Sequence, residues 1–512
     1  MNSLKQIVCL MLTLMMVTTG IVSAQADDIV LEPFTNELFE LQGVIPQGWT
    51  EVSPGIYARS STPSDRTAIF QQSVVLSAEQ LLPALMPQLG LSELPEAVGT
   101  LAADTMTWTL YQVNVIGIAV DMAMAEQGGR TYLVMLMASP DDFEGLHDAV
   151  FLPALDALQP LASTAEAEDV PYIQEDVTFD NGDVTLAGTL TLPEGEGPHP
   201  AVVLVTGSGP QDRDESLAPV AAIKPFRLIA DHLTRNGIAV LRYDDRGAGE
   251  STGDFTTSTI QDFATDAAAA IDFLASREDI NAEQIGLIGH SEGGLVAAML
   301  GSGDTDLAYI VALAGPGVIG RDVLLVQNER LLAAQGATDE QIQLQIEFLQ
   351  QAYPLIDRQD WAALETLLRE TITTQMEQLP EGERPPADAL GDAQLALTVQ
   401  AQLSNLQSPW FASFLNYDPQ PDWTQIDIPV LAIFGGKDVQ VDAEQNAPAV
   451  EAALEQGGNE DYKVIVYPDA NHLFQQAETG GFDEYGTLEQ TFIADLLPDI
   501  TEWILERVDV AE

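Results

Sequence analysis

One stretch near the middle of the chain, residues 284–298, constrains the fold more than any other. It begins with an apolar run, Ile285–Ile288, of the kind found in buried parallel strands. Glycines stand two residues before and two residues after Ser291, and a helix-forming segment follows. A serine at so sharp a turn has strained backbone, and neighbours without Cβ allow the strand and the helix to approach. The pattern predicts a strand, a turn that exposes a nucleophilic serine, and a helix whose N-terminus faces developing negative charge.

The chain has 512 residues, enough for two domains, and 46% of them are hydrophobic. Its beginning has the pattern of a secretory signal. Lys5 supplies a positive charge, Ile7–Met16 is apolar, and small residues at 22–26 offer a cleavage site. We expect residues 1–24 to be a signal peptide and the protein to be secreted or periplasmic. The alternative is a retained N-terminal anchor, although the apolar core is short and interrupted for a membrane span.

Cysteine content and charge exclude several classes of function. Cys9 is the only cysteine and lies within the predicted signal, so the mature chain would have no disulfide, thiolate metal site or cysteine nucleophile. The net charge is −60, from 79 acidic and 19 basic residues. Nucleic acids and anionic membranes bind basic surfaces, so we expect neither as a partner. We also expect no stable membrane insertion after signal cleavage.

Residues 27–161 predict a small α+β domain without a catalytic constellation. Its expected elements are a helix at 78–89, strands at 106–115, 116–125 and 130–138, and a helix at 143–158. A Pro-Gln-Gly-Trp opening and a Leu-Asp-Ala-Leu close make the unit resemble PsbP/Mog1-like accessory domains. His147 is expected to be a surface or packing residue rather than a ligand. The polar stretch 162–171 is expected to be a linker.

Residues 172–512 predict an α/β domain. Alternating side chains on both sides of Asn181-Gly182 favour a β-hairpin. Strands are then expected at 201–206, 238–243, 285–289, 309–314, 429–434 and 462–467, and helices at 222–236, 259–276, 295–301, 443–456 and 487–508. Such alternation is typical of a mostly parallel sheet with helices on both faces.

The alternation of strands and helices is interrupted at about 318–424. Four amphipathic helices are expected there, at 321–335, 339–352, 361–378 and 387–406. The segment is too long for a loop and too helical for a linker. We therefore expect an inserted helical lid over the strand ends.

Ser291 could also be a bystander in a glycine-rich turn, so its role depends on a base within hydrogen-bond reach. The chain has five histidines. Four are set aside because they lie in the other domain, before the first core strand, inside a helix or beside the nucleophile: His147, His199, His232 and His290. His472 remains, in a loop directly after the last sheet strand, where catalytic groups gather. The sequence therefore predicts His472 as the general base.

The acid that orients this histidine should lie between the serine and the histidine in chain order. Asp438 does, and it follows an apolar strand that ends in two glycines. Asp442 is an alternative with the features of a helix cap, and Asp469 is a rival that is close in sequence to His472. We expect Asp438 to be the acid.

Two backbone N–H groups are expected to stabilise the oxyanion. One belongs to Glu292, directly after the nucleophile. The other should come from the glycine-rich loop 206–214, where we choose Ser208, with Gly209 as the alternative. A second glycine-rich loop, 242–251, lacks the lysine and serine or threonine of a phosphate loop. We expect it to tie loops together near the site rather than to bind phosphate.

Several motifs resemble the α/β-hydrolase superfamily: Gly289-His290-Ser291-Glu292-Gly293, Gly435-Gly436-Lys437-Asp438 and Asn471-His472. Two more resemble bacterial serine esterases of the EstD type: Gly-Ser-Gly-Pro-Gln-Asp-Arg-Asp at 207–214 and Tyr-Asp-Asp-Arg-Gly at 243–247. The resemblance covers about 172–512 and implies an α/β-hydrolase fold with a Ser291, Asp438 and His472 triad. Thr206 departs from many lipases, which have a histidine before the oxyanion glycine, so this donor is supported differently here.

These residues predict a secreted serine hydrolase that cleaves carboxylic esters through an acyl-enzyme, with a small-molecule ester substrate and no metal or organic cofactor. The modest aromatic content of the inserted segment favours short to medium acyl chains. The same triad also serves serine peptidases and thioesterases. A non-catalytic binding protein on a hydrolase fold is a further alternative. The sequence does not predict an oligomeric state.

Overall fold

The structure is a computed structural model, and the residues that it describes are 29–60, 65–89, 91, 93–115, 118–161, 170–303, 305–378 and 389–510. The chain separates into two compact units. The first takes Met1–Asp169 and Leu379–Ala401, and the second takes Val170–Gln378 and Gln402–Glu512. The predicted signal peptide lies outside the described residues, as does the predicted linker apart from its last two residues. The predicted domain boundaries stay predictions.

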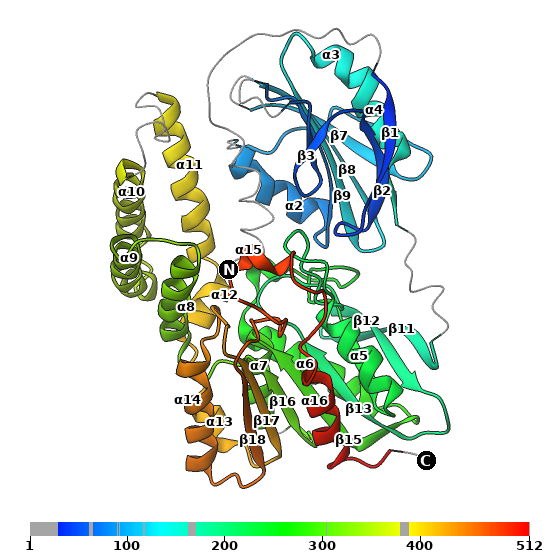
Figure 1. Cartoon of the computed structure of the whole chain (residues 1–512), viewed down its shortest axis with the longest axis vertical. Helices are drawn as coiled ribbons and strands as arrows, with labels where there is room; N and C mark the ends of the chain where they lie inside the picture. Colours follow the sequence, from blue (N-terminus) through cyan, green and yellow to red (C-terminus); the bar gives the residue numbers. More distant parts are fainter. Residues whose placement is uncertain are drawn as a thin grey trace. The chain divides into compact units, whose positions relative to one another are not determined.

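The first unit is built on an antiparallel sheet, in which the described residues form seven strands in the order β3-β4-β5-β9-β8-β7-β6 (Figure 1). The strands are β3 (Thr50–Ser53), β4 (Ile56–Ala58), β5 (Ala68–Val74), β6 (Gly99–Ala102), β7 (Thr107–Val115), β8 (Ile118–Gln127) and β9 (Arg130–Ala138). Gly128 and Gly129 join β8 to β9 with φ of 57° and 70°, a conformation that glycine adopts without strain. The strand predictions for this part are confirmed, except that residues 116 and 117 lie outside the described residues.

A smaller sheet and short helices complete the part of this unit that lies before residue 170 and is described. They are β1 (Leu31–Asn36), β2 (Leu41–Pro46), β10 (Gln159–Pro160), α2 (Ala78–Leu85), η2 (Met86–Leu89), α3 (Phe143–Leu146), η3 (His147–Phe151) and α4 (Leu152–Ala157). α2 begins with a capping box on Ser77, and its buried Leu81 and Leu85 join a hydrophobic cluster with Met122 and Met135 of the sheet. The resemblance to PsbP/Mog1-like domains stays a prediction.

The second unit contains a mostly parallel sheet, with eight strands within the described residues in the order β11-β12-β14-β13-β15-β16-β17-β18. The strands are β11 (Tyr172–Asn181), β12 (Val184–Pro193), β13 (His199–Val205), β14 (Ala239–Tyr243), β15 (Ile280–His290), β16 (Ile310–Leu313), β17 (Val430–Gly435) and β18 (Tyr462–Tyr467). β11 and β12 form the predicted hairpin, β12 pairs antiparallel with β14, and the other pairs are parallel. β13, β16 and β17 are buried throughout, as strands between two helical layers must be. The predicted fold class is confirmed.

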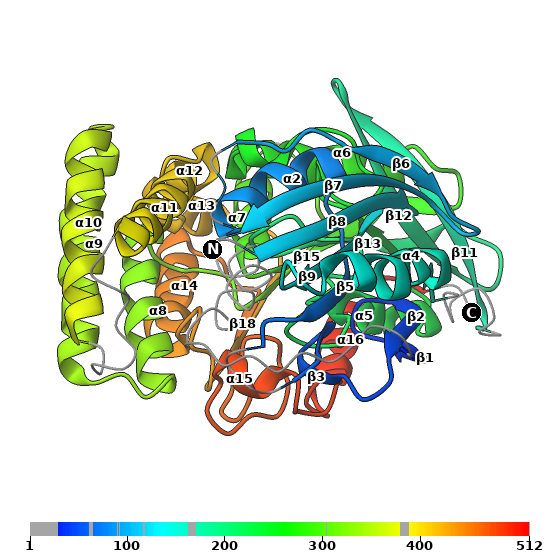
Figure 2. The same ribbon diagram turned by 90° about the horizontal axis from the view of Figure 1, so that it is seen from above.

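Helices cover both faces of this sheet. They are α5 (Pro225–Arg235), η5 (Phe255–Thr257), α6 (Ile260–Ala275), α7 (Glu292–Gly301), α14 (Ala443–Gly457), α15 (Phe482–Tyr485) and α16 (Leu496–Leu505). α5 contacts α16 and α6 contacts α7, and these two pairs lie on opposite faces of the sheet (Figure 2). α6 begins where the sequence predicts, with a capping box between Thr259 and Asp262.

The predicted closing helix at 487–508 is wrong in its first part. The helix observed there, α16, begins only at Leu496. Pro498 explains the late start, because proline has no N–H and its ring would collide with the Ala494 carbonyl if the helix extended further back. Pro498 lies in the first turn of α16, the part of a helix in which a proline costs least.

Between β16 and β17 the chain forms the inserted helices, as predicted. They are α8 (Gly320–Ala334), α9 (Asp339–Asp357), α10 (Trp361–Gln378), α11 (Ala389–Leu406), α12 (Pro409–Asn416) and α13 (Gln420–Gln425). α9 packs against both α8 and α10 (Figure 1). α12 contacts α8 and also α6, so the end of the insertion rests on a helix that covers the sheet. The role of the inserted helices as a lid stays a prediction.

Candidate active site

Ser291 lies at the turn between β15 and α7, as predicted. Its backbone has φ 54° and ψ −114°. This conformation is unfavourable in free energy for any residue that has a side chain. The turn is held by the Ser291 N–H, which donates to the Leu313 carbonyl at 2.8 Å at the end of the neighbouring strand β16. Backbone strain of this kind persists only where the surrounding structure enforces it, and it is common at functional sites.

The two glycines of this turn are required by sterics. A methyl group on Gly289 would lie 2.0 Å from the Gly293 carbonyl oxygen. One on Gly293 would lie 2.2 Å from the Val205 carbonyl oxygen. The start of α7 therefore lies directly against the end of β13, and the close approach predicted from the glycine spacing is confirmed.

His472 and Asp438 come from the loops that follow the neighbouring strands β18 and β17. His472 Nδ1 lies 2.7 Å from Asp438 Oδ2, and the two side chains expose only 6% and 0% of their surface. Asp438 Oδ1 accepts the backbone N–H groups of Gln440 and Val441 at 2.7 and 2.9 Å. A carboxylate held in this way sets the orientation and the tautomer of the imidazole that it contacts.

His472 approaches the nucleophile turn through His290, the residue before Ser291. The centroids of the two imidazole rings are 4.7 Å apart. Among the described residues, no hydrogen bond joins Ser291 Oγ to His472 Nε2. Catalytic hydrogen bonds are often long until substrate is bound. The triad of Ser291, Asp438 and His472 stays a prediction that this arrangement accommodates.

Asp442, the alternative acid, has a different role. Its side chain accepts the Gln445 N–H at 2.9 Å and caps the N-terminus of α14. It also forms an ion pair with Arg330 at 3.0 Å. Asp442 is therefore a helix cap, as its position in the sequence suggested.

The loop after β13 lies against the nucleophile. A methyl group on Gly207 would be 3.2 Å from the Cβ of Ser291. The Gly207 N–H is already used, because it donates to Glu215 Oε1 at 3.0 Å. An oxyanion donor from this loop must therefore come from a later residue, which is consistent with Ser208. Glu292 is the first residue of α7, where N–H groups have no partner within the helix.

Glu292 carries a buried carboxyl group whose contacts the sequence did not reveal. Its Oε2 accepts hydrogen bonds from Ser208 Oγ at 2.9 Å and from Trp410 Nε1 at 2.7 Å. Burial raises the pKa of Glu292 to about 7, although these two hydrogen bonds act in the opposite direction. Because Trp410 belongs to α12, this carboxyl group joins the nucleophile turn, the oxyanion loop and the inserted helices.

His290 makes two hydrogen bonds away from the nucleophile. Its Nδ1 lies 2.7 Å from Glu215 Oε1, and its Nε2 lies 2.9 Å from the main-chain oxygen of His472. Burial lowers the pKa of His290, but the charge of Glu215 and the hydrogen bonds to Glu215 and His472 outweigh it, so the net shift is upward. Glu215 precedes His290 by 75 residues, and nothing in the sequence indicated that they are partners.

The loop after β14 ties its neighbours together, as predicted. Asp245 accepts the Thr206 hydroxyl at 2.7 Å and the Gln211 N–H at 3.0 Å. Burial raises the pKa of Asp245 well above its ordinary value. Thr206, which stands where many lipases have a histidine, therefore anchors the loop 206–214 to this aspartate.

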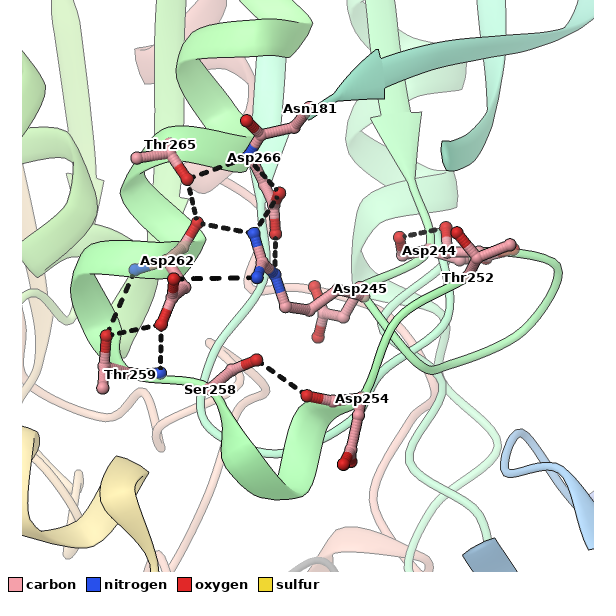
Figure 3. Close-up of polar contacts among 12 residues, drawn as sticks. Asn181, Asp244, Asp245, Thr252, Asp254, Ser258, Thr259, Asp262, Thr265 and Asp266 are labelled. Carbon is pink, nitrogen blue, oxygen red and sulfur yellow. Dashed lines mark hydrogen bonds and ion pairs between the residues drawn. The ribbon is translucent and has the colours of Figure 1, made fainter. Parts of the chain in front are cut away.

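Arginines near the same loop are paired with carboxylates. Arg246 binds Asp266 through two nitrogens at 2.6 and 2.7 Å, and Asp266 also accepts a hydrogen bond from Asn181 at 2.8 Å (Figure 3). Arg213 contacts Asp244 at 2.7 Å. These cations are engaged within the unit, so the alternative of a phosphate loop gains no support from their arrangement.

Among the described residues, no group of three or more His, Cys, Asp or Glu side chains is arranged to hold a metal ion. Nor does any helix in that part of the chain have the length and apolar character needed to cross a membrane. Near the nucleophile, the carboxyl groups of Asp245, Glu292 and Asp438 accept hydrogen bonds from protein donors.

The known proteins to which this chain is similar in sequence are described as hydrolases or esterases. A family model described as the alpha/beta hydrolase family matches residues 202–482. Esterase EstD of Thermotoga maritima is 29% identical over 320 residues, which cover 62% of this chain and 65% of that protein. The putative hydrolase YtaP of Bacillus subtilis is 33% identical over 115 residues, which cover 20% of this chain and 38% of that protein. The chain thus spans 65% and 38% of the lengths of these relatives.

Solved structures with some likeness to this chain include an esterase and a protein named Est1E. The Pyrococcus furiosus esterase Pf2001 has a TM-score of 0.41 and 18% identity, covering 66% of this chain and 93% of that one. Est1E of Butyrivibrio proteoclasticus, solved with ferulic acid, has a TM-score of 0.35 and 16% identity, covering 64% of this chain and 96% of that one. TM-scores as low as these give no information on the substrate of this chain.

Proposed function

Because this chain belongs to the α/β-hydrolase family, we propose that it is a serine hydrolase that cleaves carboxylic esters. The observation that carries the proposal is the buried Asp438–His472 pair, joined at 2.7 Å, on loops that meet the strained turn of Ser291. The order serine, aspartate, histidine along the chain is the one expected for this fold. The Thermotoga maritima relative is named an esterase, which supports esters as the substrate class.

In the proposed reaction, Ser291 Oγ attacks the acyl carbon while His472 Nε2 takes its proton. Asp438 holds the Nδ1–H and stabilises the imidazolium that forms. His472 then protonates the leaving alcohol, and an acyl-enzyme remains on Ser291. Water activated by His472 hydrolyses that ester and restores the serine.

The backbone N–H groups of Ser208 and Glu292 would bind the oxyanion of each tetrahedral intermediate. Engagement of the Gly207 N–H by Glu215 supports Ser208 as the donor from its loop. The first turn of α7 supports Glu292, because its free N–H groups and the helix dipole favour negative charge there. No metal or organic cofactor takes part in this scheme.

We propose small-molecule esters with short to medium acyl chains as substrates. The large aromatic side chains of α12, Trp410, Phe411 and Phe414, are buried. Trp410 stacks on Phe414 with ring centroids 5.7 Å apart. Their burial supports soluble substrates, because an enzyme that acts on a fat surface needs exposed apolar area around its site.

We also propose that the protein is exported, to the periplasm or outside the cell. The support is the signal-like pattern of residues 1–24 and the strongly acidic composition, with a net charge of −60, which favours solubility. The first unit would then be an accessory domain, since no catalytic constellation is seen in its sequence.

A substrate panel on the full chain tests the proposed activity. We expect hydrolysis of nitrophenyl esters with a maximum at short or medium chains, and labelling of Ser291 by a fluorophosphonate. Ser291→Ala should lower kcat on the order of 10⁶-fold. Ser276→Ala is the matched control, because Ser276 is exposed at the end of α6 and its hydroxyl only donates to the Phe273 carbonyl.

Other outcomes would redirect the proposal. Cleavage of peptide amides or thioesters without simple esters would make the protein a peptidase or a thioesterase. A maximum at long acyl chains would overturn the chain-length proposal. Failure of the fluorophosphonate to label Ser291 would favour a non-catalytic binding protein.

A further inference from the structure

A second buried histidine–carboxylate pair lies beside the proposed catalytic one. His290 and Glu215 expose only 7% and 1% of their side chains, and their Nδ1–Oε1 distance is 2.7 Å. The same Glu215 oxygen accepts the Gly207 N–H at 3.0 Å. On its other side, His290 Nε2 faces the His472 carbonyl oxygen at 2.9 Å. Four groups are therefore linked in one buried chain of hydrogen bonds.

The chemistry of the two acceptors determines the protonation of His290. A backbone carbonyl can only accept, so Nε2 must carry a proton. Glu215 Oε1 already accepts an N–H from Gly207, so it favours a donor at Nδ1 as well. Both ring nitrogens would then donate, which would make the ring an imidazolium. The carboxylate of Glu215 supplies the countercharge without which a buried cation would be costly.

The pair touches three loops of the site. Glu215 and Gly207 belong to the loop after β13, His290 ends β15 directly before the nucleophile, and His472 lies in the loop after β18. We propose that Glu215 and a doubly protonated His290 form a buried ion pair that positions the His472 main chain and the oxyanion loop for the reaction. The kinetic consequence rests on the proposed ester hydrolysis, whereas the ion pair itself does not.

The surroundings of His290 support this assignment. The ionisable groups that face it are Glu215, Asp438 and His472, from the loops after β13, β17 and β18. The charge of Glu215 and the hydrogen bonds act in the same direction, and the pKa of His290 is shifted upward despite its burial. Glu215 Oε2 is buried and has no hydrogen-bond partner among the described residues, so the pair depends on Oε1. Loss of either partner would leave the other as an unpaired buried group.

Nuclear magnetic resonance of the full chain tests the ion pair. The protein would be labelled with ¹⁵N-histidine and would carry Ser291→Ala, so that the result is independent of activity. We expect protons on both ring nitrogens of His290 at a pH above about 6.5, the ordinary pKa of a histidine, where an unperturbed imidazole has lost one of them. The signal is assigned by its absence from His290→Gln. A single ring proton at that pH would overturn the proposal, whatever the substrate of the enzyme.

Steady-state kinetics tests positioning. His290→Gln should lower kcat by about 10²-fold, because small misplacements of a catalytic group cost that much. KM should change far less, because the pair does not touch the substrate. Glu215→Gln keeps Oε1 as an acceptor and allows a neutral His290, so a smaller, roughly tenfold loss of kcat is expected. Glu215→Leu should match His290→Gln.

His147→Gln is the matched control. In the first unit, His147 Nδ1 lies at the same distance, 2.7 Å, from Asp121 Oδ2, but 33% of the His147 side chain is exposed. Its replacement should leave kcat and KM unchanged. Folded His290 and Glu215 variants with wild-type kcat would refute the positioning role. If the wild type hydrolyses no ester, the rate at which a fluorophosphonate labels Ser291 replaces kcat, so the two proposals fail separately.

Discussion

Two histidine–carboxylate pairs lie next to each other in the second unit, and their geometry is nearly the same. His472 contacts Asp438 and His290 contacts Glu215, both through Nδ1 at 2.7 Å. All four side chains are almost completely buried. In each pair a carboxylate sets the orientation of an imidazole in a loop or strand end near Ser291.

The pairs differ at the second ring nitrogen. His290 Nε2 faces the main-chain oxygen of His472, whereas within the described residues His472 Nε2 forms no hydrogen bond. A ring nitrogen that donates its hydrogen bond to a carbonyl oxygen is not available to exchange protons with a substrate. A ring nitrogen without a hydrogen-bond partner is available. The same two side chains therefore suit either positioning or proton transfer, and the group that faces the second nitrogen decides which.

Among changes to the two pairs, replacing the carboxylate of the proposed catalytic pair should have the largest effect. Asp438→Asn would favour the wrong tautomer of His472, and we expect kcat to fall by about 10⁴-fold with little change in KM. Nitrophenyl ester hydrolysis measures this loss. A loss no larger than that of Glu215→Gln would mean that the two pairs are not functionally different.

Glu292 sharpens the comparison, because it is a buried carboxyl group beside the nucleophile without a histidine partner. Burial raises its pKa to about 7 from an ordinary value of 4.5, so the folded protein holds this proton where the unfolded chain has lost it. The contribution to stability is complete below pH 4.5 and is lost as the pH rises through 7. Glu292→Gln should remove this dependence and raise the free energy of unfolding at pH 8 by up to about 3 kcal/mol.

Urea unfolding at about pH 5 and pH 8 measures the effect of Glu292→Gln. Glu283→Gln is the control, because Glu283 lies on the same strand as the nucleophile turn but is exposed. If the difference in unfolding free energy between the wild type and Glu292→Gln is the same at both pH values, the raised pKa of Glu292 is contradicted.

Replacing Asp442 should have the smallest effect, and it distinguishes the proposed acid, Asp438, from this alternative four residues away. Asp442→Ala removes the cap of α14 and should lower the free energy of unfolding by about 1 kcal/mol. The rate of hydrolysis by the folded variant should stay within about twofold of the wild-type rate. The reason is that the side chain of Asp442 contacts Gln445 and Arg330 rather than His472. A loss of several orders of magnitude would instead identify Asp442 as the acid.

Much of the fold was predictable because its signals are local. The glycines around Ser291, the hairpin at Asn181-Gly182 and the capping box at Thr259 each express a backbone requirement within a few residues. The predicted closing helix is too long at its start for a related reason. The pattern that suggests it continues on the N-terminal side of Pro498, where the ring of this proline disfavours a preceding helical turn.

The serine turn and the choice of His472 and Asp438 as partners follow from the sequence alone, because strand ends, chain order and few histidines leave little choice. The neighbours of Glu292 and the pairing of His290 with Glu215 were decided only by the tertiary structure. Trp410 reaches Glu292 from 118 residues away, and Glu215 reaches His290 from 75. Neither contact has a local backbone signature, because a buried carboxyl group is satisfied by whichever donors the packed loops bring to it. The sequence therefore indicated which residues could react, and the packing decided what holds them in place.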